Sequence, residues 1–294
     1  GVAGSFGAVL ARRVLTRRPK GELPEIVYKR LREIAAARPT AVNLMWSIKR
    51  FENIINLNIG KSWEYLSKLF YKEALMIFNE EKKVSLLISK FGSKLFTNNN
   101  KVLTHCNTGS LATTGPGTAL GVIKAANKKN KGLQVFATET RPLLQGSRLT
   151  VWECEQDNID CTLLTDSMAS HIIREKKINL AIVGADRIAV NGDVANKIGT
   201  YQLAIACKYH KIPFFIAAPL STFDFECPEG KMIEIEERSS EEILKISGKI
   251  VSIASKVVNP AFDVTPNKLI SGIITEKEII MNPNKKKIIK FKDY

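Results

Sequence analysis

The chain has 294 residues, of which 45% are hydrophobic and 25% are charged, and its formal net charge at pH 7 is +15. These proportions are those of an ordinary folded protein, so they exclude the disordered and collagen-like classes. The length allows a full hydrophobic core and two domains. The positive charge favours an anionic partner, either a nucleic acid or a phosphorylated small molecule, without choosing between them.

The pattern from residue 1 to about residue 96 predicts helices. Pro24 stands at a helix start and Pro39 ends that helix, after which Thr40 can cap the next one. A longer amphipathic segment follows over residues 62–89. Residues 1–20 lack acids and carry five basic residues, as transit peptides do. Their Ala/Val/Leu spacing also fits a helix of the fold, so we interpret them as an incomplete or processed start.

After a polar break at residues 96–101 the periodicity changes to short apolar runs that alternate with helical patterns. The predicted strands are 102–104, 134–138, 161–164, 180–183, 213–217 and 270–274. Such alternation indicates βαβ units and a mostly parallel sheet. We therefore predict an α/β protein with an N-terminal helical domain over residues 1–98 and a Rossmann-like sheet domain over residues 99–294.

The stretch around Asp186 is the strongest candidate for chemistry. Residues 178–183 read as a buried strand, which places Asp186 just past its carboxyl end, the edge where open α/β sheets bind ligands. Residues 191–193 (Asn-Gly-Asp) predict a turn, and Ala195-Asn196-Lys197 is predicted to open a helix. The alternative is that Asp186 only caps a turn and Lys197 is a solvated helix residue.

A second candidate follows the first strand of the sheet. Cys106 stands at that strand's carboxyl end, and the glycine-rich residues 115–121 open a helix whose N–H groups can bind an anion. Leu120 breaks the Gly-x-Gly-x-x-Gly spacing, and no acid follows at the position that dinucleotide folds use. Neighbouring donors would favour a Cys106 thiolate. A buried, inert thiol is the alternative.

Further polar groups follow the second strand. Glu139, Arg141 and Gln145 can each bond a sugar hydroxyl or a phosphate, although a surface Arg–Glu pair is also possible. The three histidines show no metal-ligand spacing, so no metal is predicted. The five cysteines form neither a CxxC pair nor a zinc spacing, and their odd number argues against a disulfide framework. We predict a reducing, cytoplasmic compartment and, since no apolar run is long enough to span a bilayer, no membrane association.

Six segments, in chain order, resemble the methylthioribose-1-phosphate isomerase family. They are residues 38–44, 104–109, 112–121, 139–148, 184–200 without the loop 188–190, and 259–266. The resemblance implies conversion of ring-closed 5-methylthioribose 1-phosphate into the open-chain ketose, methylthioribulose 1-phosphate, in methionine salvage. It implies that Asp186 is the acid and Cys106 its partner on the adjoining strand. The substrate contacts that it implies are Arg38, Gln145, Asn196 and Lys197.

The same resemblance implies no metal or organic cofactor, a phosphorylated sugar as substrate, and a homodimer; nucleic acid binding is not expected. The family also carries an Arg-Gly-Ala-Pro segment shortly before the position of Gly1. We expect either that the chain is a fragment or that its phosphate binding is weaker. Two other functions stay open: a regulatory subunit of the translation-initiation guanine-nucleotide exchange factor, and an isomerase of ribose 1,5-bisphosphate. Cys106, Asp186 and Asn196-Lys197 favour catalysis over the regulatory subunit.

Overall fold

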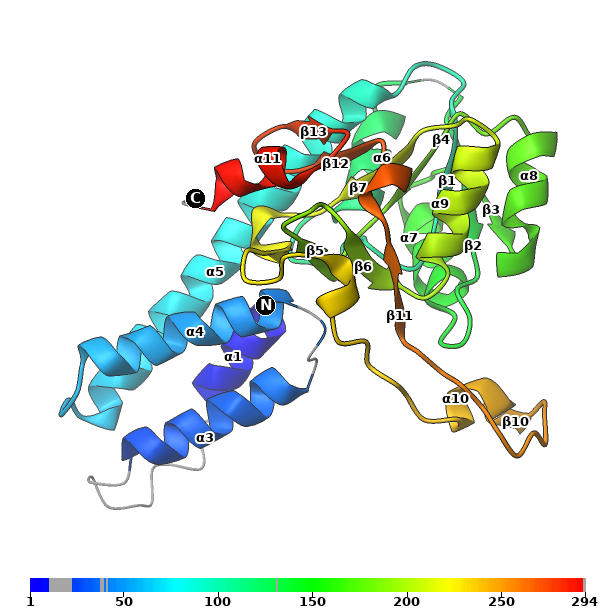
Figure 1. Cartoon of the computed structure of the whole chain (residues 1–294). Helices are drawn as coiled ribbons and strands as arrows, with labels where there is room; N and C mark the ends of the chain where they lie inside the picture. The colour runs from blue at the N-terminus through cyan, green and yellow to red at the C-terminus, as the bar shows by residue number, and fades with distance from the viewer. Residues whose placement is uncertain (11–22, 38–39, 41, 131, 293–294) are drawn as a thin grey trace.

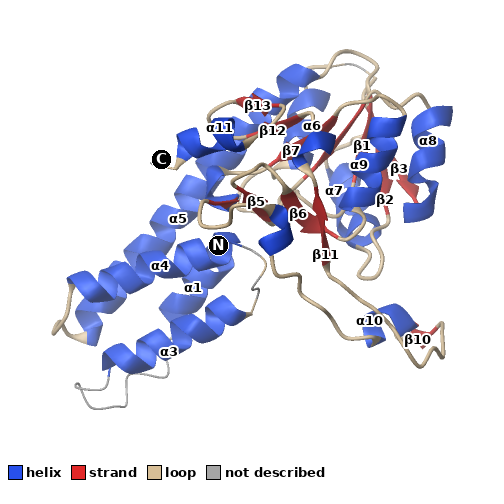
Figure 2. Cartoon of the chain, viewed as in Figure 1, coloured by secondary structure: helices blue, strands red, loops and turns tan. Residues whose placement is uncertain are grey.

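The computed structural model describes residues 1–10, 23–37, 40, 42–130 and 132–292. Its α-helices are α1 (Val2–Leu10), α3 (Leu23–Ala36), α4 (Val42–Leu57), α5 (Trp63–Gly92), α6 (Ala119–Asn127), α7 (Val151–Gln156), α8 (Ala169–Glu175), α9 (Thr200–Tyr209), α10 (Glu241–Leu244) and α11 (Lys285–Ile288). Its strands are β1 (Lys101–Thr104), β2 (Gln134–Thr138), β3 (Cys161–Leu164), β4 (Leu180–Val183), β5 (Arg187–Ala189), β6 (Val194–Lys197), β7 (Phe214–Ala217), β8 (Phe223–Asp224), β9 (Lys245–Ile246), β10 (Lys249–Ile250), β11 (Phe262–Thr265), β12 (Gly272–Ile274) and β13 (Ile279–Met281). The predicted α/β class is confirmed (Figure 2).

Helices α1 and α4 pack against the first half of the long helix α5, and α3 packs against α1 and α4 (Figure 1). Ser62 caps α5 by accepting a hydrogen bond from the Tyr65 backbone N–H at 3.3 Å. Phe51, Trp63 and Phe70 form the centre of this helical core, with Phe70 edge-on to both other rings. The second half of α5 packs against α6. Because one helix serves both regions, the proposed division at residue 98 stays a prediction.

The main sheet has seven strands in the order β13-β12-β7-β4-β1-β2-β3. Neighbours pair in parallel except β13, which pairs antiparallel to β12. Helices α8, α9 and α11 bury apolar side chains against one face, whereas α5, α6 and α7 do so against the other. Both faces are therefore covered, as the near-continuous hydrophobicity of the central strands requires.

Strand β1 lies between β2 and β4, and the chain builds the sheet outwards on either side of it. The direction in which strands are added to the sheet thus reverses between β1 and β4. A crevice outside the carboxyl ends of two such strands is where doubly wound folds bind ligands. Cys106 and Asp186 follow those two strands.

A smaller sheet, in the order β11-β6-β5-β8, lies beside this crevice. The predicted Asn-Gly-Asp turn is confirmed, because residues 191–193 join β5 to β6 in an antiparallel hairpin. Between β8 and β11 the chain forms an arm with α10, β9 and β10 that projects from the body (Figure 1).

The prediction that a helix opens at Ala195-Asn196-Lys197 is wrong. These residues belong to β6, which pairs with β5 on one side and β11 on the other, and α9 starts only at Thr200. Gly199, with φ of +100°, makes the change of direction in a left-handed conformation that suits glycine. Pairing with a strand more than sixty residues away outweighs the local helical pattern.

Candidate active site

Cys106 stands two residues beyond β1 in an unusual backbone conformation, with φ of +63°. Its N–H donates to Thr140 Oγ1 at 2.9 Å, and its carbonyl accepts from Thr150 Oγ1 at 2.5 Å. The residue is half-buried, so the alternative of a fully buried thiol does not describe it.

His105, the residue before Cys106, fixes the chain at this point through both ring nitrogens. Its ring is buried, with Nε2 2.8 Å from the Ile198 carbonyl and Nδ1 2.6 Å from Thr138 Oγ1. A carbonyl can only accept, so Nε2 carries the proton and the Thr138 hydroxyl donates to Nδ1. Burial lowers the pKa of His105, which keeps the ring neutral at pH 7. The histidine thereby joins the Cys106 loop to the segment that follows Lys197.

Glu153, on α7, organises the loop that follows Cys106. Its buried carboxylate accepts from the Ser110 N–H at 2.7 Å, the Leu111 N–H at 3.1 Å and Asn107 Nδ2 at 3.0 Å. Lys124 Nζ lies 2.7 Å away as a counter-charge. Burial opposes ionisation, but these hydrogen bonds outweigh it and lower the pKa of Glu153. A carboxylate of the protein itself thus holds residues 107–111 in place.

Asp186 lies between the main sheet and the smaller sheet. Its N–H donates to the Ala195 carbonyl at 2.9 Å, and its own carbonyl accepts from the Val42 N–H at 3.4 Å. Gly184 allows Thr108 to approach closely, since a Cβ there would lie 2.7 Å from Thr108 Cγ2. Asp186 is therefore fixed beside β6, the Cys106 loop and the start of α4.

Asn196 and Lys197 are neighbours on β6, with exposed fractions of 4% and 7%. Lys197 Nζ donates to the Ala261 carbonyl at 2.9 Å and lies 4.4 Å from the centroid of the Phe262 ring. The alternative of a solvated Lys197 is wrong. A buried ammonium group is costly unless it meets polar or negative partners, which fits a site for an anionic substrate.

Gln145 precedes a π-helical turn over residues 146–150 that ends at Thr150, the residue bonded to Cys106. Within the described residues, Gln145 Oε1 and Asn107 Oδ1 are buried without a hydrogen-bond donor. Buried acceptors of this kind usually meet a donor. Hydroxyl groups of a bound sugar would supply one.

The other polar residues of this loop differ in what they contact. The Arg141 guanidinium donates to the carbonyls of Pro142 and Ile243, at 3.2 and 3.0 Å, and so holds the base of the arm. Among the described residues, no ion pair joins Arg141 to Glu139, which is half-buried. Arg38 lies outside the described residues, although its neighbour Thr40 accepts from Arg187 Nε at 3.0 Å.

Sequence reasoning missed the residues that hold this site together. Thr140 lies within the segment 139–148 but was given no role, whereas Thr150 and Glu153 lie outside the six segments. All three side chains are buried and polar. Asp263, on β11, accepts from the N–H groups of Gly199 and Tyr201 at the start of α9. For Asp263, the signal that sequence reasoning could have used is a lone acid between the apolar residues Phe262 and Val264.

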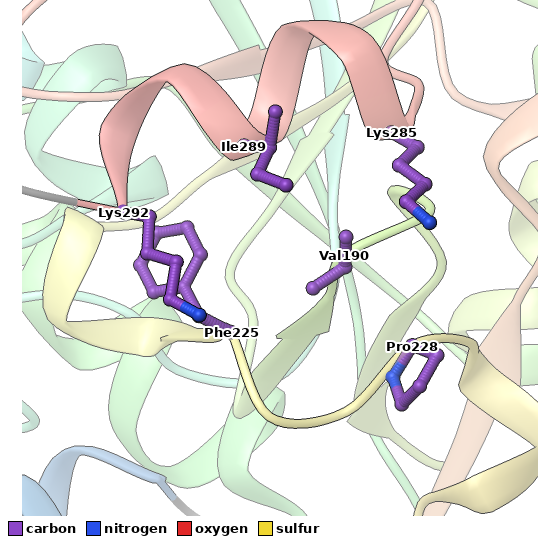
Figure 3. Close-up of a pocket in the computed structure, with 6 residues that line it drawn as sticks. All are labelled: Val190, Phe225, Pro228, Lys285, Ile289 and Lys292. Carbon is purple, nitrogen blue, oxygen red and sulfur yellow. The ribbon is translucent and has the colours of Figure 1, made fainter.

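A separate cavity of about 180 Å³ lies between β5 and the C-terminal helix (Figure 3). Its lining residues are Val190, Phe225, Pro228, Lys285, Ile289 and Lys292. None of the predicted site residues lines it, and Lys292 pairs with Glu226 at 3.7 Å. We therefore do not place the chemistry there.

Within the described ranges, no cluster of three or more His, Cys, Asp or Glu side chains is arranged to hold a metal ion. No helix of these ranges is long and apolar enough to cross a membrane.

Comparison with known proteins identifies the family. The Initiation factor 2 subunit family matches residues 3–282. Methylthioribose-1-phosphate isomerase of Acetivibrio thermocellus is 49% identical over 99% of this chain and 86% of its own length. The enzyme of that name from Thermoanaerobacter pseudethanolicus is 47% identical over 99% and 85%. The chain belongs to the Initiation factor 2 subunit family, together with the methylthioribose-1-phosphate isomerases.

Solved structures of this family share the fold. The 5-methylthioribose 1-phosphate isomerase of Pyrococcus horikoshii superposes with a TM-score of 0.86 at 38% identity, covering 99% of this chain and 82% of that one. A structure described as translation initiation factor eIF-2B subunit delta, from A. fulgidus, superposes with a TM-score of 0.80 at 41% identity, covering 98% and 85%. The resemblance inferred from the sequence segments is confirmed.

Proposed function

We propose that this chain is an aldose-ketose isomerase that converts 5-methylthioribose 1-phosphate into 5-methylthioribulose 1-phosphate in methionine salvage. Relatives at 47–49% identity over almost the whole chain carry the name of that enzyme. The observation that supports the proposal is that Cys106 and Asp186 follow the neighbouring parallel strands β1 and β4, and that Asp186 bonds to β6, which carries the buried Asn196-Lys197 pair.

The reaction requires proton transfer at two places. Because the phosphate at C1 blocks spontaneous ring opening, an acid must protonate the ring oxygen as its bond to C1 breaks. Hydrogen then moves from C2 to C1, and the C2 hydroxyl loses its proton as it becomes a carbonyl. Substrate and product are isomers, so the sequence of steps consumes no external oxidant or reductant.

We assign Asp186 as the acid, which regains its proton when the carbonyl forms, and Cys106 as the second proton-handling group at C2 and C1. Lys197 and Arg38 supply positive charge for the phosphate. Asn196 and Gln145 form hydrogen bonds with the hydroxyl groups of the sugar, and the unpaired Gln145 Oε1 supports this role. No step requires a metal or an organic cofactor.

A regulatory role in translation initiation is the second candidate, because the A. fulgidus structure named as an initiation-factor subunit is 41% identical to this chain. Incubation with 5-methylthioribose 1-phosphate, and separately with ribose 1,5-bisphosphate, followed by detection of the ketose, separates the candidates. We expect ketose from the first substrate. Cys106→Ser should abolish most of this conversion, and Cys161→Ser, which alters another half-buried cysteine, is its matched control. Failure of the folded protein to convert either sugar would contradict the proposal, and preference for the bisphosphate would replace the substrate.

We further propose a homodimer in a reducing, cytoplasmic compartment. All five cysteines are free thiols in the described structure. Several large apolar side chains of the projecting arm and its base are strongly exposed, among them Ile253 at 95% and Val258 at 77%. Large apolar side chains that are exposed in one region of a chain are typical of surfaces that another protein covers, which supports self-association.

A further inference from the structure

Cys106 occupies a backbone conformation that it would not adopt unaided. A φ of +63° is left-handed, a region disfavoured for any residue that carries a Cβ. Such conformations persist where the surroundings impose them. The neighbouring hydrogen bonds must therefore account for the position of the Cys106 side chain.

Two threonine hydroxyls form hydrogen bonds with the Cys106 backbone, one with its N–H group and one with its carbonyl group. Thr140 Oγ1 accepts from the Cys106 N–H at 2.9 Å and donates to the Thr138 carbonyl at 3.2 Å. Thr150 Oγ1 donates to the Cys106 carbonyl at 2.5 Å and accepts from Asn107 Nδ2 at 3.3 Å. Each hydroxyl uses its proton and its acceptor, so the orientation of each is defined.

Both threonines are fixed within the core. The exposed fraction of Thr140 is 0% and that of Thr150 is 1%. The carboxylate of Asp166 accepts from the N–H groups of Thr140 and Arg141 at 2.8 and 2.7 Å, which ties this loop to the end of β3. Thr150 ends the π-helical turn. Water cannot easily replace either hydroxyl at such buried positions.

We propose that Thr140 and Thr150 are positioning residues that hold Cys106 in its left-handed conformation and so aim its thiol at the reacting carbons. This inference rests on the proposed role of Cys106. Both buried hydroxyls bond to the Cys106 backbone, so the threonines act through Cys106. A misplacement of about 1 Å in a catalytic group can lower the rate on the order of 100-fold.

The test compares Thr150→Val and Thr140→Val, which keep the side-chain shape and remove the hydroxyl, with Thr150→Ser and Thr140→Ser, which keep the hydroxyl. Thr162→Val, at an exposed threonine of β3, controls for the general effect of the change. We expect each Val variant to lower kcat roughly 10- to 100-fold while KM changes less than about threefold. The Ser variants should retain kcat within a few-fold of the wild type.

A second readout does not depend on turnover. The rate at which iodoacetamide alkylates Cys106, followed by peptide mass spectrometry, reports how the thiol is held. The Cys106 thiol is half-buried while the two hydroxyls hold its backbone, and loss of either hydroxyl should let the thiol become more exposed. We therefore expect alkylation to be severalfold faster in the Val variants than in the Ser variants and the wild type. Folding of each variant is checked by its thermal unfolding midpoint.

The outcomes separate this inference from the proposed function. A wild type that forms no ketose would refute the function, and the alkylation rates alone would then decide the role of the threonines. Equal alkylation rates in the Val and Ser variants would overturn the inference even if the enzyme is active. Ser variants as impaired as Val variants would also overturn it, since the methyl group and not the hydroxyl would then matter.

Discussion

At the residue scale, the site depends on a few buried polar groups whose partners are defined. His105 is neutral because burial lowers its pKa, and its single ring proton goes to the Ile198 carbonyl. Lys197 is buried beside a carbonyl and an aromatic ring. Such groups are costly to bury without partners, so each defines the geometry around it.

Cys106→Ser and Asp186→Asn should each abolish most turnover while the fold is retained. Both changes are nearly isosteric, and loss of one positioned proton-transfer group lowers a rate by roughly 10²- to 10⁴-fold. Steady-state kinetics of ketose formation, with circular dichroism as the check on folding, measure this. Wild-type turnover in either variant would remove that residue from the mechanism.

Asp263 should make stability depend on pH in the mildly acidic range. Burial raises its pKa from 3.8 to about 6, against the opposing bonds from the Gly199 and Tyr201 N–H groups. The folded protein therefore binds this proton more tightly than the unfolded chain does. The resulting stability is fully present below about pH 4 and is lost as the pH rises through about 6.

Asp263→Asn should remove this pH-dependent component, which is at most about 3 kcal/mol for a shift of this size. The variant also loses one backbone hydrogen bond at every pH, because an amide accepts through only one of its two terminal atoms. Thermal unfolding between pH 4.5 and 7.5 should show a smaller loss with rising pH in the variant. Asp160→Asn, at an exposed site, is the control. Identical pH profiles for Asp263→Asn and the wild type would contradict the assignment.

At the element scale, α7 fixes the loop after β1 through Glu153, and the hairpin of β5 and β6 places Asn196 and Lys197 beside Asp186. The loop that carries Cys106 is thus held by α7, and the segment that carries Asp186 is held by β6. Rigid support of this kind keeps a site precise.

Glu153→Gln should destabilise the protein by about 1–3 kcal/mol, because the new amide N–H group faces donors that previously met a carboxylate oxygen. Turnover should fall as well, since residues 107–111 lose their anchor. Denaturant unfolding measures the first effect and ketose formation the second. Glu155→Gln, an exposed neighbour on the same helix, should change neither. Equal effects of the two substitutions would show that the Glu153 carboxylate does not hold the loop.

At the scale of the whole molecule, the helical region and the sheet meet through α5 and through the contact of Val42 with Asp186. The arm with α10, β9 and β10 leaves the body with apolar side chains exposed. We expect a second copy of the chain to cover these apolar side chains.

The proposed homodimer predicts a mass of twice 32.7 kDa in solution. Light scattering at micromolar protein concentration measures this directly, and closed two-fold assembly is the commonest outcome for such chains. A mass that stays at that of one chain over this range would contradict the dimer.

Periodicity and turn residues sufficed to predict the α/β class, six of the seven strands of the main sheet, and the positions of Cys106 and Asp186 beyond strand ends, because these are local properties of the chain. The four strands of the smaller sheet were not predicted. The quoted segments also sufficed to indicate the family. The folded structure was needed to show that Asn196 and Lys197 lie on a strand, that Lys197 is buried, and that Thr140, Thr150 and Glu153 hold the Cys106 loop. These features arise from contacts between residues far apart in the chain, whose energies outweigh local preference and leave no pattern in any single stretch.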